Sequence, residues 1–243
     1  MRKVMALLLL TAMLLSLFGC GKESVVSPTL EFQGIPWNSS LEVVCQKLAL
    51  KPEQYTQGEI ESDATSSAFD VTLRDWKVFG ETAASAVLLF ENFNPEVSNH
   101  FGLTTVLICY PESSDKEKIL SNLRKEYGPE AETYISYGID GTPREYTREP
   151  GEARWFSQQL AVDVLTDGGK EAYRNLLGDR SEKEIQGFFA NPAAQISWTE
   201  DFYSGLTPDL AEELISKYGH MAYLSITGSG LTILSQRFDT VSE

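Results

Sequence analysis

The fold is decided by the stretch LTTVLICYPESSDKEKILSNLRKEYG at residues 103–128. Its first part, residues 103–110, is apolar and rich in β-branched side chains, and Pro111 closes it, which predicts a buried strand. Ser114 and Glu117 then stand at capping-box spacing, which predicts the start of a helix. The apolar residues of that helix recur on one face: Ile119, Leu120, Leu123 and Tyr127. A strand that leads into an amphipathic helix implies a sheet for the helix to cover.

Upstream of this stretch, the apolar pattern predicts two more strands, at residues 69–79 and 83–90. A helix is predicted over residues 40–50, because Ser39 and Glu42 stand at capping-box spacing and apolar residues follow at the helical period. The sheet therefore has at least three strands before the helix that follows residue 114.

Downstream, short apolar segments alternate with turn residues, which predicts further strands joined by hairpins. The expected strands are residues 131–138, 143–149, 153–159 and 160–165, with a hairpin turn at 139–142, and two short strands within 221–238 broken at 228–230. Three helices are also expected: residues 170–177, residues 181–189, and a helix starting at Pro208 with the apolar stripe Leu210, Leu214, Ile215 and Tyr218.

These elements predict an α+β fold, with an antiparallel sheet or sheets covered by a few helices. The segment Ile35-Pro36-Trp37 before the first helix is similar to Ile196-Ser197-Trp198 before the helix at Pro208. Two related modules therefore stay an open alternative to a single domain. We divide the chain into residues 1–19 as signal peptide, 20–31 as flexible tether, 32–166 as α+β domain, and 167–243 as an extension packed on that domain or a second small module.

The first twenty residues, MRKVMALLLLTAMLLSLFGC, have a basic start, an apolar run and a small residue before Cys20. These are the parts of a secretory signal peptide. An uncleaved membrane helix is the alternative, but the apolar run is short for a bilayer and a polar segment with Ser and Pro follows it. The sequence Leu17-Phe18-Gly19-Cys20 resembles the lipobox of bacterial lipoproteins, with Phe18 where small or β-branched residues are commoner. The resemblance implies that Cys20 becomes a lipid-modified N-terminus.

The chain is acidic, with 35 acidic against 20 basic side chains and a formal net charge of −15. Such a charge repels phosphate backbones, which excludes direct binding to nucleic acid as an expected function. The acidic residues are spread along the sequence, which is typical of a solvated surface.

The remaining cysteines, Cys45 and Cys109, lie in apolar patterns that suit small buried side chains, so two free thiols are favoured over a disulfide. The two histidines, His100 and His220, have no partner at metal-ligand spacing. We therefore expect no metal site and no cofactor.

Catalytic motifs are weak. Ser113 and Lys116 have the S-x-x-K spacing of some serine nucleophiles, but the partner motifs of that class are absent and the same segment is a helix cap. No G-x-S-x-G elbow accompanies His100 or His220, and each histidine has a simpler structural interpretation. The sequence therefore favours a protein that is not an enzyme over an envelope hydrolase without a recognisable local motif.

Four tryptophans are the candidate ligand-binding residues, because all are expected near the ends of predicted elements, where a ring can face a glycan or a protein: Trp37, Trp76, Trp155 and Trp198. The alternative is that they fill the core at the ends of the sheet.

A second resemblance covers residues 32–128. The motif F-x-G-I-P-W at residues 32–37, Val78-Phe79-Gly80, and Gly102-Leu103 before Val106 are similar to the small α/β modules of bacterial envelope lipoproteins, of the β-lactamase-inhibitor-like and outer-membrane-assembly kinds. The chain departs from that pattern at Asn38, where Gly is expected. The resemblance implies an antiparallel sheet covered by helices and a binding role, and it supplies no functional residues.

Together these features predict a lipoprotein anchored to the cell membrane on its extracytoplasmic face. Its expected partners are the lipid bilayer, through a diacylglyceryl group on Cys20, and either an envelope protein or a cell-wall glycan. The folded part is then a non-enzymatic binding module. An envelope hydrolase without a recognisable local motif is the alternative.

Overall fold

The computed structural model describes residues 28–63, 65–137, 142–200 and 220–240, together with Glu212 and Ser216. The predicted signal peptide, most of the tether, the turn at 139–142 except Thr142, and most of the helix expected after Pro208 lie outside these residues. Within the described part, no helix is both long enough and apolar enough to cross a bilayer.

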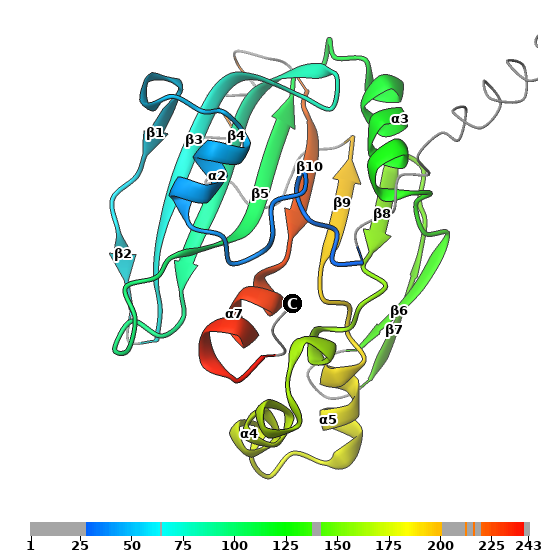
Figure 1. The fold of residues 1–243 in the computed structure, drawn as a ribbon. Helices are drawn as coiled ribbons and strands as arrows, with labels where there is room; N and C mark the ends of the chain where they lie inside the picture. The colour runs from blue at the N-terminus through cyan, green and yellow to red at the C-terminus, as the bar shows by residue number, and fades with distance from the viewer. Residues whose placement is uncertain are drawn as a thin grey trace, which may run out of the picture.

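Eight strands of the described chain form one antiparallel sheet (Figure 1). They are β1 Tyr55–Gln57, β2 Glu61–Ser62, β3 Ser67–Val78, β4 Glu81–Asn92, β5 Gly102–Tyr110, β8 Glu152–Phe156, β9 Gln195–Thr199 and β10 Ala222–Thr227. The order is β1-β3-β4-β5-β10-β9-β8, and β2 pairs with β3. The predicted α+β class, with an antiparallel sheet and a few helices, is confirmed.

The sheet consists of two meanders that meet in its centre. Strands β3, β4 and β5 are consecutive neighbours, as are β8, β9 and β10, and β10 pairs with β5 over six residues. Strands β9 and β10 come from the segment 167–243, and yet they lie in the same sheet as the strands of 32–166. The boundary at residue 166 therefore does not separate two sheets.

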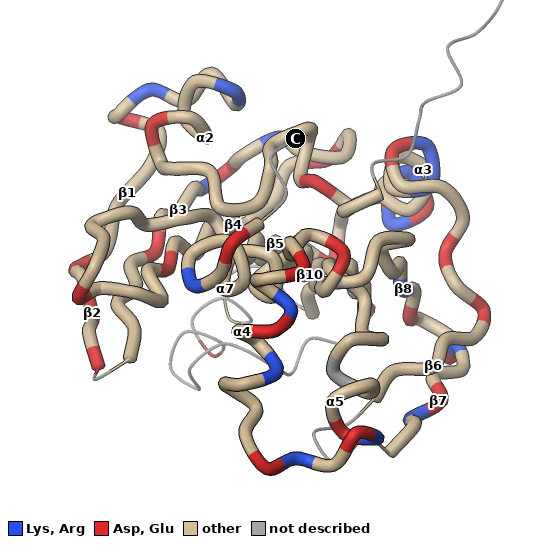
Figure 2. The backbone as a smooth tube through the Cα atoms, turned by 60° about the horizontal axis from the view of Figure 1, so that its bottom comes forward, with Lys and Arg blue, Asp and Glu red and all other residues tan. Residues whose placement is uncertain are grey.

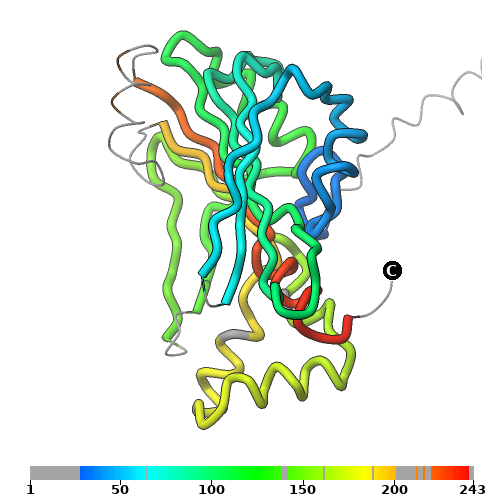
Figure 3. Tube along the Cα trace, turned by 90° about the vertical axis from the view of Figure 1, so that its left-hand side faces the viewer, coloured from blue at the N-terminus to red at the C-terminus, as the bar shows by residue number. Residues whose placement is uncertain are grey.

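Five helices are seen in the described chain: α2 Leu41–Lys47, α3 Lys116–Tyr127, α4 Asp167–Leu177, α5 Glu182–Phe189 and α7 Ser229–Arg237. Residues 28–50 and α3 cover one face of the sheet, which we call the helix face (Figure 3). A separate hairpin of β6 Thr133–Tyr137 and β7 Pro143–Thr147 lies on the opposite face, the hairpin face.

The core lies on the helix face because alternate residues of each strand point to it. The following strand residues are all buried and aligned across the ladder: Val71, Leu88, Val106, Ile226, Ile196 and Trp155. Residues from the covering segments complete the cluster: Phe32, Ile35, Val44, Ile119 and Leu123. The inner face predicted for α3 is confirmed, since all four of its residues are buried.

The helix caps differ from the predicted ones by one residue. Helix α2 is capped by Ser40, whose hydroxyl accepts the N–H of Val43 at 3.5 Å, and it ends at Lys47 before Ala49 takes a positive φ of 52°. Helix α3 is capped by Asp115, whose carboxylate accepts the N–H of Lys118 at 3.0 Å. Both segments offer neighbouring side chains that can cap, and sequence spacing does not choose between them.

Two predicted strands are wrong. Residues 160–165 contain a short 3₁₀ helix, η2 Ala161–Val164, whose start is fixed because the Asp163 carboxylate accepts the N–H of Leu160 at 3.0 Å. The segment after the break at 228–230 is α7, with Leu231 and Leu234 buried on one face. Its β-branched residues suggested a strand, but the spacing of its leucines suits a helix packed on β5.

An ion-pair cluster attaches the hairpin to the end of α3. The Glu130 side chain is only 7% exposed and accepts from Arg124 Nε at 2.9 Å and from Arg124 Nη2 at 2.8 Å. Arg148, directly after β7, contacts Glu130 at 3.1 Å and the exposed Glu132 at 2.9 Å. Together these contacts fix where the hairpin lies on the sheet.

Candidate functional site

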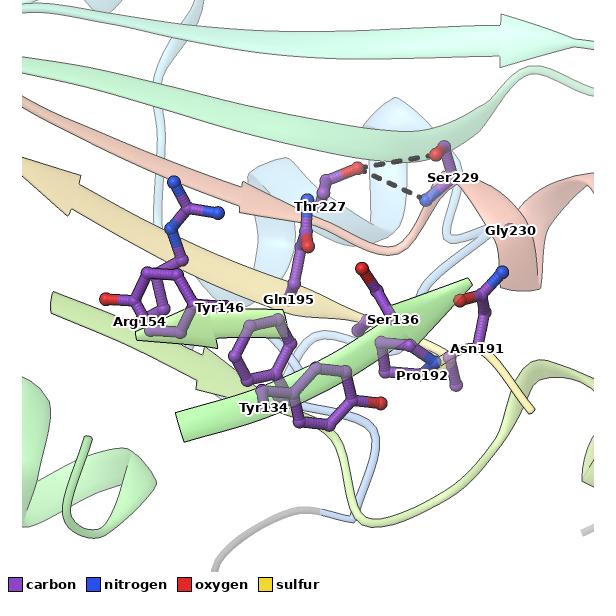
Figure 4. Close-up of a pocket in the computed structure, with 13 residues that line it drawn as sticks. Tyr134, Ser136, Tyr146, Arg154, Asn191, Pro192, Gln195, Thr227, Ser229 and Gly230 are labelled. Carbon is purple, nitrogen blue, oxygen red and sulfur yellow. Dashed lines mark hydrogen bonds between the residues drawn. The ribbon is translucent and has the colours of Figure 1, made fainter. Parts of the chain in front are cut away.

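A cavity of about 260 Å³ lies between the hairpin and the sheet, and we call it the hairpin pocket (Figure 4). Its lining residues come from β6, β7, β8, β9, the end of β10, the start of α7, and the segment 191–194. On the sheet side, Arg154, Gln195 and Thr227 alternate with core residues and therefore point to the hairpin face. The pocket thus forms where two separate layers meet.

Three aromatic rings make one continuous wall of the hairpin pocket. The Tyr134 ring stacks on Phe156 with centroids 3.7 Å apart and planes at 11°. The Tyr146 ring meets Phe156 edge-on, with centroids 6.0 Å apart. Tyr134 and Tyr146 are cross-strand partners in the hairpin, so its register sets this wall.

Arg154 carries the positive charge of the pocket. Its guanidinium lies over the Tyr146 ring, 4.5 Å from the centroid, which is a cation–π contact. Its nearest carboxylate is Glu152, at 3.7 Å, and the Arg154 side chain is 39% exposed. Among the described residues that line the pocket, none is acidic. Elsewhere, Asp and Glu are spread over most elements (Figure 2), so this pocket differs in charge from the rest of the chain.

The other end of the hairpin pocket is polar. Thr227 accepts the N–H of Ser229 at 3.4 Å, at the first turn of α7, and Gly228 provides no side chain to cap that turn (Figure 4). Asn191 accepts the N–H of Tyr137 at 3.0 Å and donates to its carbonyl at 3.3 Å, which ties the hairpin to the segment before β9. The pocket therefore has an aromatic and cationic end and a polar end.

The Tyr146 hydroxyl is buried and has no hydrogen-bond partner within the described chain. Burial raises the pKa of Tyr146, because the ionised form loses hydration. A buried hydroxyl without a partner costs stability, so the position of this ring is set by Phe156 and Arg154 and not by its polar atom.

The structure does not bring the four predicted tryptophans together. Trp155 and Trp198 are each 2% exposed and lie in the core, on neighbouring strands. Trp37 is 8% exposed, donates to the Thr29 carbonyl at 2.9 Å and borders a cavity of about 420 Å³. Trp76 is half-buried against Phe32 and borders a hollow of about 280 Å³. Trp155 and Trp198 have no exposed ring face, and a ligand role for Trp37 and Trp76 stays a prediction.

Trp37 packs directly on the backbone of Gly228, where a Cβ atom would collide with its ring. The indole therefore requires glycine at the turn between β10 and α7, which is a packing role at the start of α7.

The predicted nucleophiles and histidines have structural surroundings in the described chain. Lys116 pairs with Glu200 at 2.9 Å. His100 Nε2 lies 2.8 Å from the Asn38 carbonyl, and His220 is exposed. No group of three metal-binding side chains occurs among the described residues.

Cys45 and Cys109 are both free in the described chain, as favoured from the sequence. Cys109 is buried, and burial raises the pKa of its thiol to about 12, so it is not a reactive thiolate. Cys45 is only half-buried, so its expected burial is incomplete.

Sequence reasoning missed the residues of the hairpin pocket. One signal was present in part: the predicted hairpin brings the strand of Tyr134 beside the strand of Tyr146. The predicted turn at 139–142 pairs Tyr134 with Thr147, however, which is one residue away from the observed partner Tyr146. The contribution of Arg154 and Asn191 depends on how the hairpin lies on the sheet, and no local pattern contains that. Comparisons with protein families, with curated proteins and with solved structures found no match for this chain.

Proposed function

We propose that this chain is a lipoprotein anchored to the cell membrane through Cys20, and that its extracytoplasmic domain is a non-enzymatic module that binds a cell-wall ligand in the hairpin pocket. The observation that carries the binding role is the pocket itself, with its aromatic wall, its arginine and its polar end. Apolar walls with a few placed polar groups are typical of ligand sites.

The lining supports binding over hydrolysis. Its hydroxyl groups belong to Ser136, Thr227, Ser229 and two tyrosines, and the described lining contains no His, Asp or Glu to act as a general base. A serine nucleophile needs such a base within hydrogen-bond reach. The envelope hydrolase considered from the sequence therefore gains no support from this pocket.

Replacing Cys20 with Ala in the full-length chain tests the anchor. We expect loss of incorporated radiolabelled fatty acid and release of the protein from the membrane fraction, because the thiol is the predicted site of lipid attachment. Unchanged lipid labelling together with unchanged membrane retention would show that the lipobox interpretation is wrong.

Filling the hairpin pocket tests the binding site. Gln195 is exposed on the floor of the pocket, and Gln195→Trp is expected to weaken cosedimentation of the full-length protein with purified cell-wall material by about tenfold or more. The control is Thr82→Trp, the same ring on an exposed strand position of β4 outside the pocket, which should leave binding unchanged. Equal binding by the wild type and both variants, or no binding by the wild type, would contradict the proposed site.

A further inference from the structure

We infer that the ligand of the hairpin pocket is a sugar acid, meaning one saccharide unit that carries a carboxylate. This rests on the proposed function and deepens it, because it names the ligand class of the same pocket. Three properties of the pocket support it: its size, the chemistry of its lining and the position of Arg154.

The volume limits the ligand to a small one. At about 260 Å³, the hairpin pocket is smaller than the roughly 300–1,000 Å³ typical of sites for drug-sized ligands. A single sugar unit suits this space, with any longer glycan continuing outside it.

The lining suits a ring with an apolar face and a polar rim. The wall of Tyr134, Phe156 and Tyr146 offers aromatic surface for the C–H groups of a sugar ring. Neutral polar side chains lie at the floor and the polar end of the pocket, and they can donate hydrogen bonds to the hydroxyls of a sugar ring and accept hydrogen bonds from them. These side chains are Ser136, Asn191, Gln195, Thr227 and Ser229. Asn191, Thr227 and Ser229 also hydrogen-bond within the described chain, so Ser136 and Gln195 are the groups that a purely apolar ligand would leave without partners.

The charge of the lining selects an anion. Arg154 provides a fork of donors that matches a carboxylate, and its contact with Glu152 at 3.7 Å is longer than a hydrogen bond. The described lining offers no carboxylate acceptor, so a ligand that supplies acceptors is favoured over one that supplies donors.

Two pairs of sugars test this inference. One pair is N-acetylmuramic acid and N-acetylglucosamine, and the other is glucuronic acid and glucose. Each pair compares an acidic sugar with its neutral counterpart, and binding to the full-length protein in a mild detergent is measured by calorimetry. We expect each acid to bind about tenfold or more tightly than its neutral counterpart. Preference for the muramic acid points to peptidoglycan as the source, and preference for the uronic acid points to an acidic polysaccharide.

Substitution of Arg154 locates the carboxylate. Arg154→Gln should remove the preference for the acids while leaving the affinity for the neutral sugars unchanged, and Arg154→Lys should keep only part of it because an ammonium group has no planar fork. Arg144→Gln is the matched control, since Arg144 is exposed on the neighbouring strand β7 and does not line the pocket. Thermal unfolding of each variant checks that the fold is retained.

Equal affinity for acids and neutral sugars, absence of binding by all four sugars, or an unchanged preference in Arg154→Gln would each overturn the sugar-acid inference. The proposed function would still stand in these cases if Gln195→Trp, but not Thr82→Trp, abolished binding to cell-wall material. The two proposals therefore fail separately.

Discussion

Replacing Glu130 with Gln is expected to lower the free energy of unfolding by about 2 to 3 kcal/mol at pH 7. The Glu130 side chain is 7% exposed. Its carboxylate accepts two hydrogen bonds from Arg124 and forms an ion pair with Arg148. The hydrogen bonds from Arg124 are the main cause that lowers the pKa of Glu130 to about 2. Because both guanidinium groups are about a third exposed, water reduces the contribution below the full value implied by that pKa.

The loss should depend on pH in a defined direction. The pKa of Glu130 is lower in the folded protein than in the unfolded chain, so its ionised form stabilises the fold above the unfolded pKa. That stabilisation is lost as the pH falls from about 5 to about 2, as the carboxyl becomes protonated. Urea unfolding at several pH values should therefore show wild type and Glu130→Gln converging in acid.

Glu132→Gln is the matched control, because Glu132 binds the same Arg148 at 2.9 Å but is 77% exposed. We expect a loss below about 0.5 kcal/mol, as for other exposed ion pairs. Equal losses in the two variants, or a Glu130→Gln effect that does not change between pH 7 and pH 3, would contradict the assigned role of the cluster.

The elements that sequence alone predicts well are those whose signals are local. Strand β5 and helix α3 follow from the apolar pattern of residues 103–128, and the capping pair Ser181 and Glu184 marks the start of α5. In each case the residues that determine the element are within a few positions of one another. Long-range pairing then adds to a preference that is already present.

The arrangement of the sheet could not be predicted in the same way. Strand β10 pairs with β5, although the two strands are more than a hundred residues apart in the sequence. The sequence does not predict strand β9, because the strand Gln195–Thr199 is only five residues long and only Ile196 and Trp198 point to the core. Pairing with β8 on one edge and β10 on the other stabilises it, and such context overrides weak local propensity.

The departure of Asn38 from the expected glycine has a physical reason. Asn38 has a φ of +67°, in the left-handed region that glycine adopts freely and asparagine tolerates better than most residues. Its side-chain oxygen also accepts a hydrogen bond from Gln236 at 2.9 Å, which glycine could not do. Asparagine therefore meets the backbone requirement that favours glycine, and its side chain also connects residue 38 to α7.

Truncation of the two core tryptophans should have the largest effects on stability. Trp155→Ala and Trp198→Ala are each expected to cost about 3 to 5 kcal/mol, because each removes a side chain that is 2% exposed and leaves a cavity. Urea unfolding of the full-length variants measures these losses. Costs below about 1 kcal/mol would contradict the placement of these rings in the core.

Phenylalanine at the same positions separates packing from hydrogen bonding. Trp155 Nε1 donates to the Gly128 carbonyl at 2.8 Å, whereas Trp198 Nε1 is buried without a partner in the described chain. Trp155→Phe should therefore cost about 1 kcal/mol or more beyond Trp198→Phe, since only the second substitution removes a buried donor that makes no bond. The reverse order would show that the Trp198 donor has a partner in solution.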